Sequence, residues 1–166
     1  MKKLLFIGLL LSMTGCSKVY EIINNDTTQE PVVEEDTSEK TLVCRQEDGD
    51  SVTFIAKGDE VHQMKQVSHI AYDELGLDPN TMDKDVIQQQ INQAITDKYQ
   101  GLAGVGIIGQ MAEDKIEITA DINFDQADIQ ALIDAGLLSQ GEKDSQYISL
   151  KKTQEEYKNS YACEFE

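Results

Sequence analysis

Three cysteines are the residues of this sequence best suited to covalent chemistry. They are Cys16, Cys44 and Cys163, in a chain of 166 residues. A thiol can be alkylated, can pair in a disulfide or can bind a metal ion, and its surroundings and spacing decide which of these happens. No two of the three have the C-x-x-C spacing of redox motifs, so a redox-active pair is not expected.

The segment before Cys16 has the layout of an export signal. Two lysines give it a positive start, and residues 4–11 form an apolar run that is shorter than the roughly 20 residues needed to span a bilayer. The sequence MTGC (13–16) then resembles the lipobox of bacterial lipoproteins, with Met13 where leucine is usual. We therefore expect a signal peptide over residues 1–15.

The lipobox resemblance implies a lipid anchor on Cys16. Its thiol would be alkylated with diacylglycerol, and cleavage would leave Cys16 as the first residue. Acyl chains such as palmitate would then hold the protein, with about 0.8 kcal/mol for each buried CH₂. This predicts a lipoprotein on the extracytoplasmic face of the cell membrane. The alternative is an ordinary cleaved signal in which Cys16 is incidental.

With Cys16 assigned to lipid, Cys44 and Cys163 remain as an even pair. Exported proteins lie in oxidising compartments where disulfides persist. Both cysteines fall in short stretches with strand character, at opposite ends of the folded region. A Cys44–Cys163 disulfide would close a loop of roughly 120 residues and would stabilise the fold by around 4 kcal/mol. Two buried free thiols are the alternative.

The charge of the chain excludes one class of partner. The formal net charge is −17, and loss of the two leader lysines would leave 12 Lys and Arg against 31 Asp and Glu, or −19. Nucleic-acid-binding proteins present basic faces, so no nucleic-acid partner is expected. An acidic domain is also repelled by anionic lipid, which leaves the lipid anchor as the expected contact with the membrane.

Two weak patterns do not predict a cofactor or a metal site. The string Gly104-x-Gly106-x-x-Gly109 matches a dinucleotide fingerprint, but that site needs a strand before the glycines and a helix after them, the reverse of the order expected here. We expect a close-packed turn and a bulged strand instead. His62 and His69 are seven residues apart, without a zinc-like cluster, and are predicted to be surface-exposed strand residues.

No pattern predicts an active site. Ser149 and Lys152 match S-x-x-K, but the S-D-N and K-T-G partners of that chemistry are absent. A helix cap is the expected role of Ser149. We therefore expect no catalytic residue, no cofactor and no enzymatic activity.

The chain divides at about residue 40. Residues 16–40 contain few apolar side chains, so we predict that the lipidated cysteine is followed there by a disordered acidic tether. Residues 41–166 are expected to form one domain. Its strands are predicted at 41–46, 50–57, 60–72, 105–111, 115–124 and 161–165.

The third strand is expected to be irregular, and three helices complete the domain. Val61, Met64 and Val67 cannot share one face of a regular strand, which predicts a bulge or bend. An apolar stripe predicts a helix over 82–99. A second helix is expected from an Asp125 cap to about residue 135, and a third from Ser149 to about residue 159. This order predicts an α+β fold, an antiparallel sheet with helices packed on one face.

Four stretches carry a family resemblance. They are VTFIAKGDEV (52–61), KYQGLAGV (98–105), ITADINFDQADIQAL (118–132) and ISLKKTQEEYKNSYA (148–162). In these stretches the chain resembles the YehR-like small bacterial lipoproteins, a family of unknown function. The resemblance covers about residues 41–162 and implies an α+β domain without an established activity.

Two functions from different classes fit these observations. The first is a membrane-anchored, non-enzymatic module that binds an envelope protein or a peptide. The alternative is a small-molecule or metal carrier that serves an envelope transporter. A concave apolar pocket would favour the carrier, and a flat sheet face would favour the interaction module.

Overall fold

A computed structural model of the chain describes residues 36–139 and 146–166. The predicted signal peptide over 1–15, the predicted lipidation site Cys16 and most of the predicted tether lie outside the described residues. None of the described helices has the length and apolar character needed to cross a membrane.

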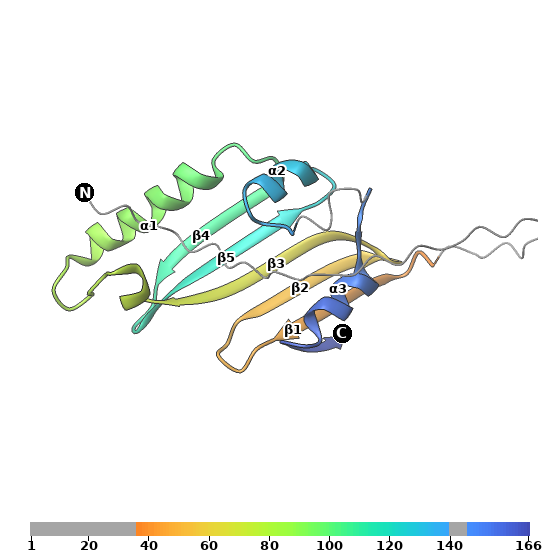
Figure 1. Cartoon of the computed structure of the whole chain (residues 1–166), viewed down its shortest axis with the longest axis horizontal. Helices are drawn as coiled ribbons and strands as arrows, with labels where there is room; N and C mark the ends of the chain where they lie inside the picture. Colours follow the sequence, from red (N-terminus) through yellow and green to blue (C-terminus); the bar gives the residue numbers. More distant parts are fainter. Residues whose placement is uncertain (1–35, 140–145) are drawn as a thin grey trace, which may run out of the picture.

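The centre of the fold is an antiparallel sheet (Figure 1). Its strands are β1 (Glu39–Arg45), β2 (Ser51–Lys57), β3 (Glu60–Ala71), β4 (Val105–Met111), β5 (Lys115–Asn123), β6 (Ile148–Ser149) and β7 (Ala162–Phe165). They lie in the order β4-β5-β3-β2-β1-β7, and the short β6 pairs with β3. The predicted hairpins are confirmed, while β6 is an addition to the predicted strands.

Over residues 36–139 and 146–166, three α-helices and one short 3₁₀ helix accompany the sheet. They are η1 (Asp73–Leu75), α1 (Lys84–Tyr99), α2 (Ile129–Asp134) and α3 (Leu150–Tyr157). In Figure 1, α1 lies along β4 and α3 lies across β1 and β2. The prediction of an α+β fold with an antiparallel sheet is confirmed.

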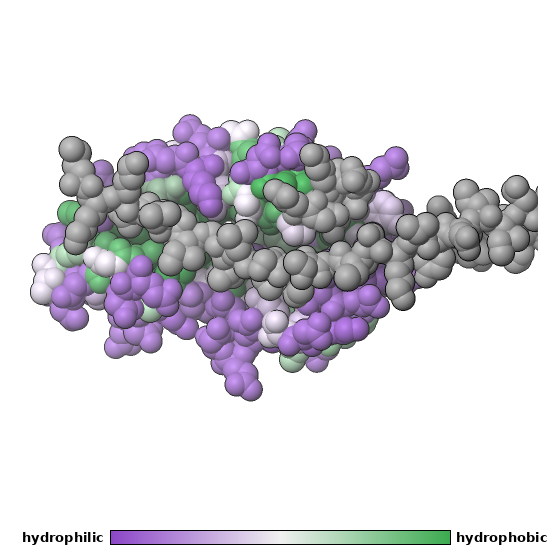
Figure 2. Space-filling model, viewed as in Figure 1, coloured by the Kyte–Doolittle hydropathy of each residue, from purple (hydrophilic) through white to green (hydrophobic). Residues whose placement is uncertain are grey.

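One face of the sheet, here called the core face, carries most of the buried apolar side chains. A row of five residues crosses five strands in register on this face: Leu42, Phe54, Met64, Ile122 and Val105. The main apolar cluster contains these side chains together with Leu132 of α2 and Leu150 of α3. Figure 2 shows hydrophilic residues over most of the visible described surface, with smaller apolar patches, one of them at α2.

A second apolar cluster lies at the α1 end of the sheet. It joins Ile87 and Ile91 of α1 to Ile116 of β5 and to Tyr72, which are all at most 7% exposed. The hydroxyl of Tyr72 donates a hydrogen bond to the carbonyl of Ala112 at 2.7 Å. This bond satisfies the polar end of a buried ring and ties the β4–β5 turn to the end of β3.

The predicted irregularity of the third strand is confirmed. Ile55 of β2 pairs with Gln63 of β3, but the next residue, Ala56, pairs with Val61. The register between the two strands therefore shifts after Ile55. His62 is therefore the extra residue of a β-bulge. The bulge brings Val61 and Met64 onto the core face together, where both are buried.

Two local predictions are wrong. The predicted Asp125 cap does not start α2, because Asp128 accepts a hydrogen bond from the backbone of Ala131 and caps the helix three residues later. The predicted bulge in the glycine-containing strand is also absent, since β4 pairs with β5 in a continuous register. Ser149, in contrast, caps α3 as predicted.

Candidate functional site

The disulfide between Cys44 and Cys163 is present in the structure. The two residues lie directly opposite each other on β1 and β7, and they are separated by 119 residues in sequence. Cys44 is fully buried in the main apolar cluster. This position in the core indicates a structural crosslink, and the prediction of a Cys44–Cys163 bridge is confirmed.

The second face of the sheet, here called the outer face, has a different composition. Its central row is Val43, Thr53, Lys65, Asp121 and Gly106, side by side on β1, β2, β3, β5 and β4. The row directly beside it contains Ile55, Gln63 and Asn123. These two rows on the face opposite the main cluster are mostly polar, while Val43 and Ile55 are apolar.

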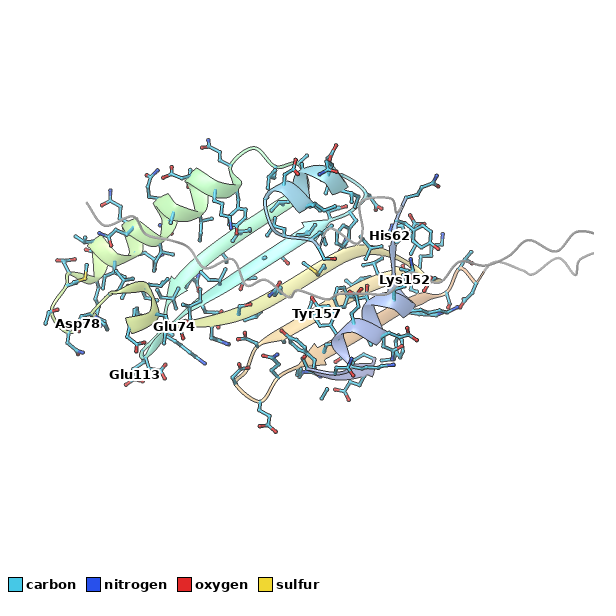
Figure 3. The ribbon with its side chains drawn as sticks, viewed as in Figure 1. His62, Glu74, Asp78, Glu113, Lys152 and Tyr157 are labelled. Carbon is cyan, nitrogen blue, oxygen red and sulfur yellow. A yellow bond between two sulfur atoms is a disulfide. The ribbon has the colours of Figure 1, made fainter. Side chains whose placement is uncertain are left out.

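A hollow of about 640 Å³ lies over this face, within the size range of ligand pockets. Six polar side chains line it: Thr53, Gln63, Lys65, Asp121, Asn123 and Gln126. Ile55, Met64, Ile122 and the segment 104–106 complete the lining. The hollow lies beside the first residues of β3 after the bulge, close to where Figure 3 labels His62.

Backbone geometry shapes one wall of the hollow. Gly104 has a φ of +70°, and a Cβ placed on it would be 2.5 Å from the carbonyl oxygen of Asn123. Its own carbonyl accepts a hydrogen bond from the amide of Asn123 at 2.7 Å. A side chain at this position would separate the start of β4 from the end of β5, so the glycine permits the wall to form.

Two of the lining side chains carry opposite charges without being joined. Lys65 and Asp121 are direct cross-strand partners. In such pairs the two Cβ atoms are generally about 5 Å apart. Within the part of the chain that the structure describes, neither side chain has an ion pair or a hydrogen bond. Both charges are therefore available to a molecule in the hollow.

The two histidines lie apart on β3 and have separate partners. His62 Nδ1 is 2.6 Å from Asp125 Oδ1, and this contact joins the bulge to the loop before α2. His69 Nδ1 is 2.8 Å from Asp50 Oδ1, and its Nε2 is 3.5 Å from Glu117. The side chain of His69 is 14% exposed, so the prediction of a surface-exposed residue is wrong for it.

The Asp50 carboxylate holds His69 against the β1–β2 turn. The same Asp50 oxygen accepts a hydrogen bond from the His69 backbone amide at 2.8 Å. The β1–β2 turn is thus attached to β3 through both the backbone and the ring of one residue. This arrangement is a structural clamp.

Ser149 takes part in a hydrogen-bonded corner rather than in a nucleophilic site. Its hydroxyl donates to Asp59 Oδ2 at 2.7 Å and accepts from the amide of Lys152 at 3.3 Å. The other Asp59 oxygen accepts from the amide of Lys151. Asp59 of the β2–β3 turn therefore holds the start of α3, which explains the S-x-x-K string structurally.

An aromatic group packs above β2, close to the disulfide. The ring of Tyr157 lies 5.3 Å from that of Phe54 in an edge-to-face arrangement, and 5.0 Å from that of Tyr161. Burial, followed by the neighbouring Tyr161 and Glu156, raises the pKa of Tyr157 to about 12. A neutral phenol in this apolar setting is a packing residue, and Figure 3 labels it at α3.

The sequence does not identify the polar side chains of the hollow as a site, although two of its glycines belong to the G-x-G-x-x-G string. Lys65, Asp121 and Asn123 are the polar members of alternating strands, which the sequence identifies as facing solvent. Their meeting depends on the β3–β5 pairing, and nothing in the local pattern of either strand states that register.

The fold defines the class of this protein: a small α+β domain with a disulfide-bonded antiparallel sheet. Residues 44–161 match the family described as "Protein of unknown function (DUF1307)". The chain belongs to this family, and the predicted resemblance to YehR-like proteins is confirmed.

Two solved structures share the fold. The NMR structure of the Escherichia coli YehR protein has a TM-score of 0.57 and 17% identity, over 78% of this chain and 93% of that one. The NMR structure of a protein from Streptococcus pneumoniae TIGR4 has a TM-score of 0.50 and 14% identity, over 91% and 99%. No curated protein matches the chain.

Proposed function

We propose that this protein is a lipid-anchored, extracytoplasmic lipoprotein whose folded domain is a non-enzymatic binding module. The observation that carries the binding role is the hollow on the outer face, with its unjoined Lys65 and Asp121 side chains. The anchor rests on the lipobox-like MTGC sequence at 13–16. The partner is a peptide or a protein segment of the cell envelope.

The arrangement of the helices supports this use of the outer face. Side chains of α2 and α3 belong to the main apolar cluster, and Ile91 and Ile95 of α1 come close to Gly109 and Ile118. We infer that the three helices pack on the core face. The outer face then remains accessible to a partner, whereas a carrier would enclose its cargo in an apolar pocket.

The anchor is tested by blocking lipoprotein maturation. In cells that produce the full chain, globomycin or the Cys16→Ser substitution should leave unprocessed precursor, because the thiol that receives the diacylglycerol is absent or the cleavage step is inhibited. Membrane fractionation and mass measurement report the outcome. Normal cleavage and release under either condition would contradict the lipoprotein assignment.

The binding role is tested by photocrosslinking in intact cells. A photoreactive residue at Ile55, which lines the hollow and is 42% exposed, should give a covalent adduct. The matched control is Ile108, which is 56% exposed on the same face but outside the hollow. Adducts of equal yield at both positions, or none at Ile55, would count against a binding site in the hollow.

A further inference from the structure

The hollow has the chemistry of a site for a short zwitterionic peptide. Resting on the proposed binding role, we propose that Lys65 binds the carboxylate of such a peptide and that Asp121 binds its ammonium group. The carboxamides of Gln63, Asn123 and Gln126 then meet the peptide groups between or beside the two charges. This assigns the ligand class for the outer-face hollow.

The two charges are placed for a ligand that carries both signs. Lys65 on β3 and Asp121 on β5 are register partners on one face, yet they form no ion pair with each other or with any other described side chain. A joined pair would satisfy itself and leave nothing for a ligand. An unjoined pair on adjacent strands presents a cation and an anion side by side, which matches the charge pattern of a zwitterion.

The charge of the whole chain argues against a simple anion. At a formal charge of −17, the protein repels phosphate and other anions at long range, and one lysine cannot reverse that field. A zwitterion has no net charge and escapes this repulsion. A simple cation would leave Lys65 without a partner next to its own charge.

The neutral lining fits peptide groups. A carboxamide donates through its nitrogen and accepts through its oxygen, the same two functions that a main-chain amide needs. Three carboxamides line the hollow, and Ile55 provides an apolar contact that is 42% exposed. The volume of about 640 Å³ is within the range of small-ligand pockets.

The test is a titration with triglycine, using the chain purified from cells in detergent. Triglycine has both charged ends and no side chains, so it probes the zwitterionic backbone alone. We expect saturable shifts of the backbone amide resonances of residues 63–65, 104–106 and 121–126. Lys65→Gln and Asp121→Asn should each weaken binding by about tenfold or more, since each removes a charge-assisted hydrogen bond.

Three controls decide between ligand classes. Lys57→Gln removes a lysine outside the lining and should bind as the unchanged protein does. N-acetyl-triglycine amide, without charged ends, and inorganic phosphate should both bind much more weakly. Equal binding of the capped peptide, stronger binding of phosphate, or no shifts with triglycine would overturn the zwitterion assignment. The crosslink at Ile55 would still report separately on whether the hollow binds a partner.

Discussion

Gly106 and Gly109 belong to one sequence motif but have different structural roles. A Cβ at Gly109 would be 2.5 Å from Ile91 Cγ2 and 2.9 Å from Ile95 Cδ1. A Cβ at Gly106 would meet nothing closer than a backbone oxygen at 4.0 Å. The glycine at 109 is therefore required by the close approach of α1 to β4, and no phosphate-binding loop is needed to explain it.

This difference predicts the outcome of two alanine substitutions. Gly109→Ala should lower the free energy of unfolding by about 1–3 kcal/mol, because the new methyl group overlaps two isoleucine side chains in a packed interface. Gly106→Ala, in the same strand, should be neutral or should stabilise the protein by up to about 1 kcal/mol. Urea unfolding of the two variants checks this. An equal loss of stability in both would show that the contact with α1 is not the cause.

At the scale of elements, one side chain closes part of the edge of the sheet. Gln88 of α1 donates a hydrogen bond from Nε2 to the carbonyl of Gly109 at 2.8 Å. Its Oε1 accepts from the amide of Met111 at 3.2 Å. The carboxamide thus replaces the neighbouring strand that β4 lacks, and it removes two free edge groups of the kind that promote aggregation.

The edge contact predicts a specific loss on truncation. Gln88→Ala should lower the free energy of unfolding by about 1–2 kcal/mol, because a part-buried N–H and C=O lose their partner. Hydrogen exchange at the Met111 amide should become faster. Gln89→Ala is the control, since Gln89 is exposed on the same helix. If both variants unfold alike and the Met111 amide exchanges at its original rate, the edge contact contributes nothing.

The elements could largely be predicted from sequence, but their edge contacts could not. The alternation of Ile116, Ile118 and Ile122 predicts β5. The spacing of Val61, Met64 and Val67, which does not fit one face of a regular strand, predicts the irregularity of β3. Three glutamines stand in a row at 88–90, and the sequence does not say which of them meets β4. Likewise Asp125 and Asp128 both have the chemistry of a cap, and only packing against the sheet decides that α2 begins after Asp128.

At the scale of the whole molecule, the pairing of segments that are distant in sequence could not be predicted. The hollow exists because β3 and β5, separated by the whole of α1 and β4 in sequence, lie next to each other. Register between such strands depends on which faces become buried, which is a property of the assembled sheet. The disulfide could be predicted because an export signal implies an oxidising compartment and because two cysteines remain once Cys16 is assigned to lipid. Neither observation requires knowledge of the strand register.

A disulfide and two ion pairs link the C-terminal segment to β1, and the disulfide contributes more to stability than the ion pairs. Four residues of β7 pair with β1 at the edge of the sheet. The accompanying ion pairs of Arg45 with Glu164 and Glu166 are exposed, and such pairs contribute at most about 1 kcal/mol each. A bridge across 119 residues is worth about 4–5 kcal/mol in the chain-entropy estimate, and it therefore outweighs them.

Reduction of the Cys44–Cys163 bridge should therefore lower the free energy of unfolding by about 4 kcal/mol. Urea unfolding with and without a reducing agent measures this loss while both sulfur atoms stay in place, so no core cavity contributes to it. Arg45→Gln, which removes the ion pairs of the same two strands, should cost less than about 1 kcal/mol. Mass analysis without reductant should find two hydrogens fewer than in the dithiol. Free thiols at both positions, or equal stability of the two redox forms, would contradict a stabilising crosslink.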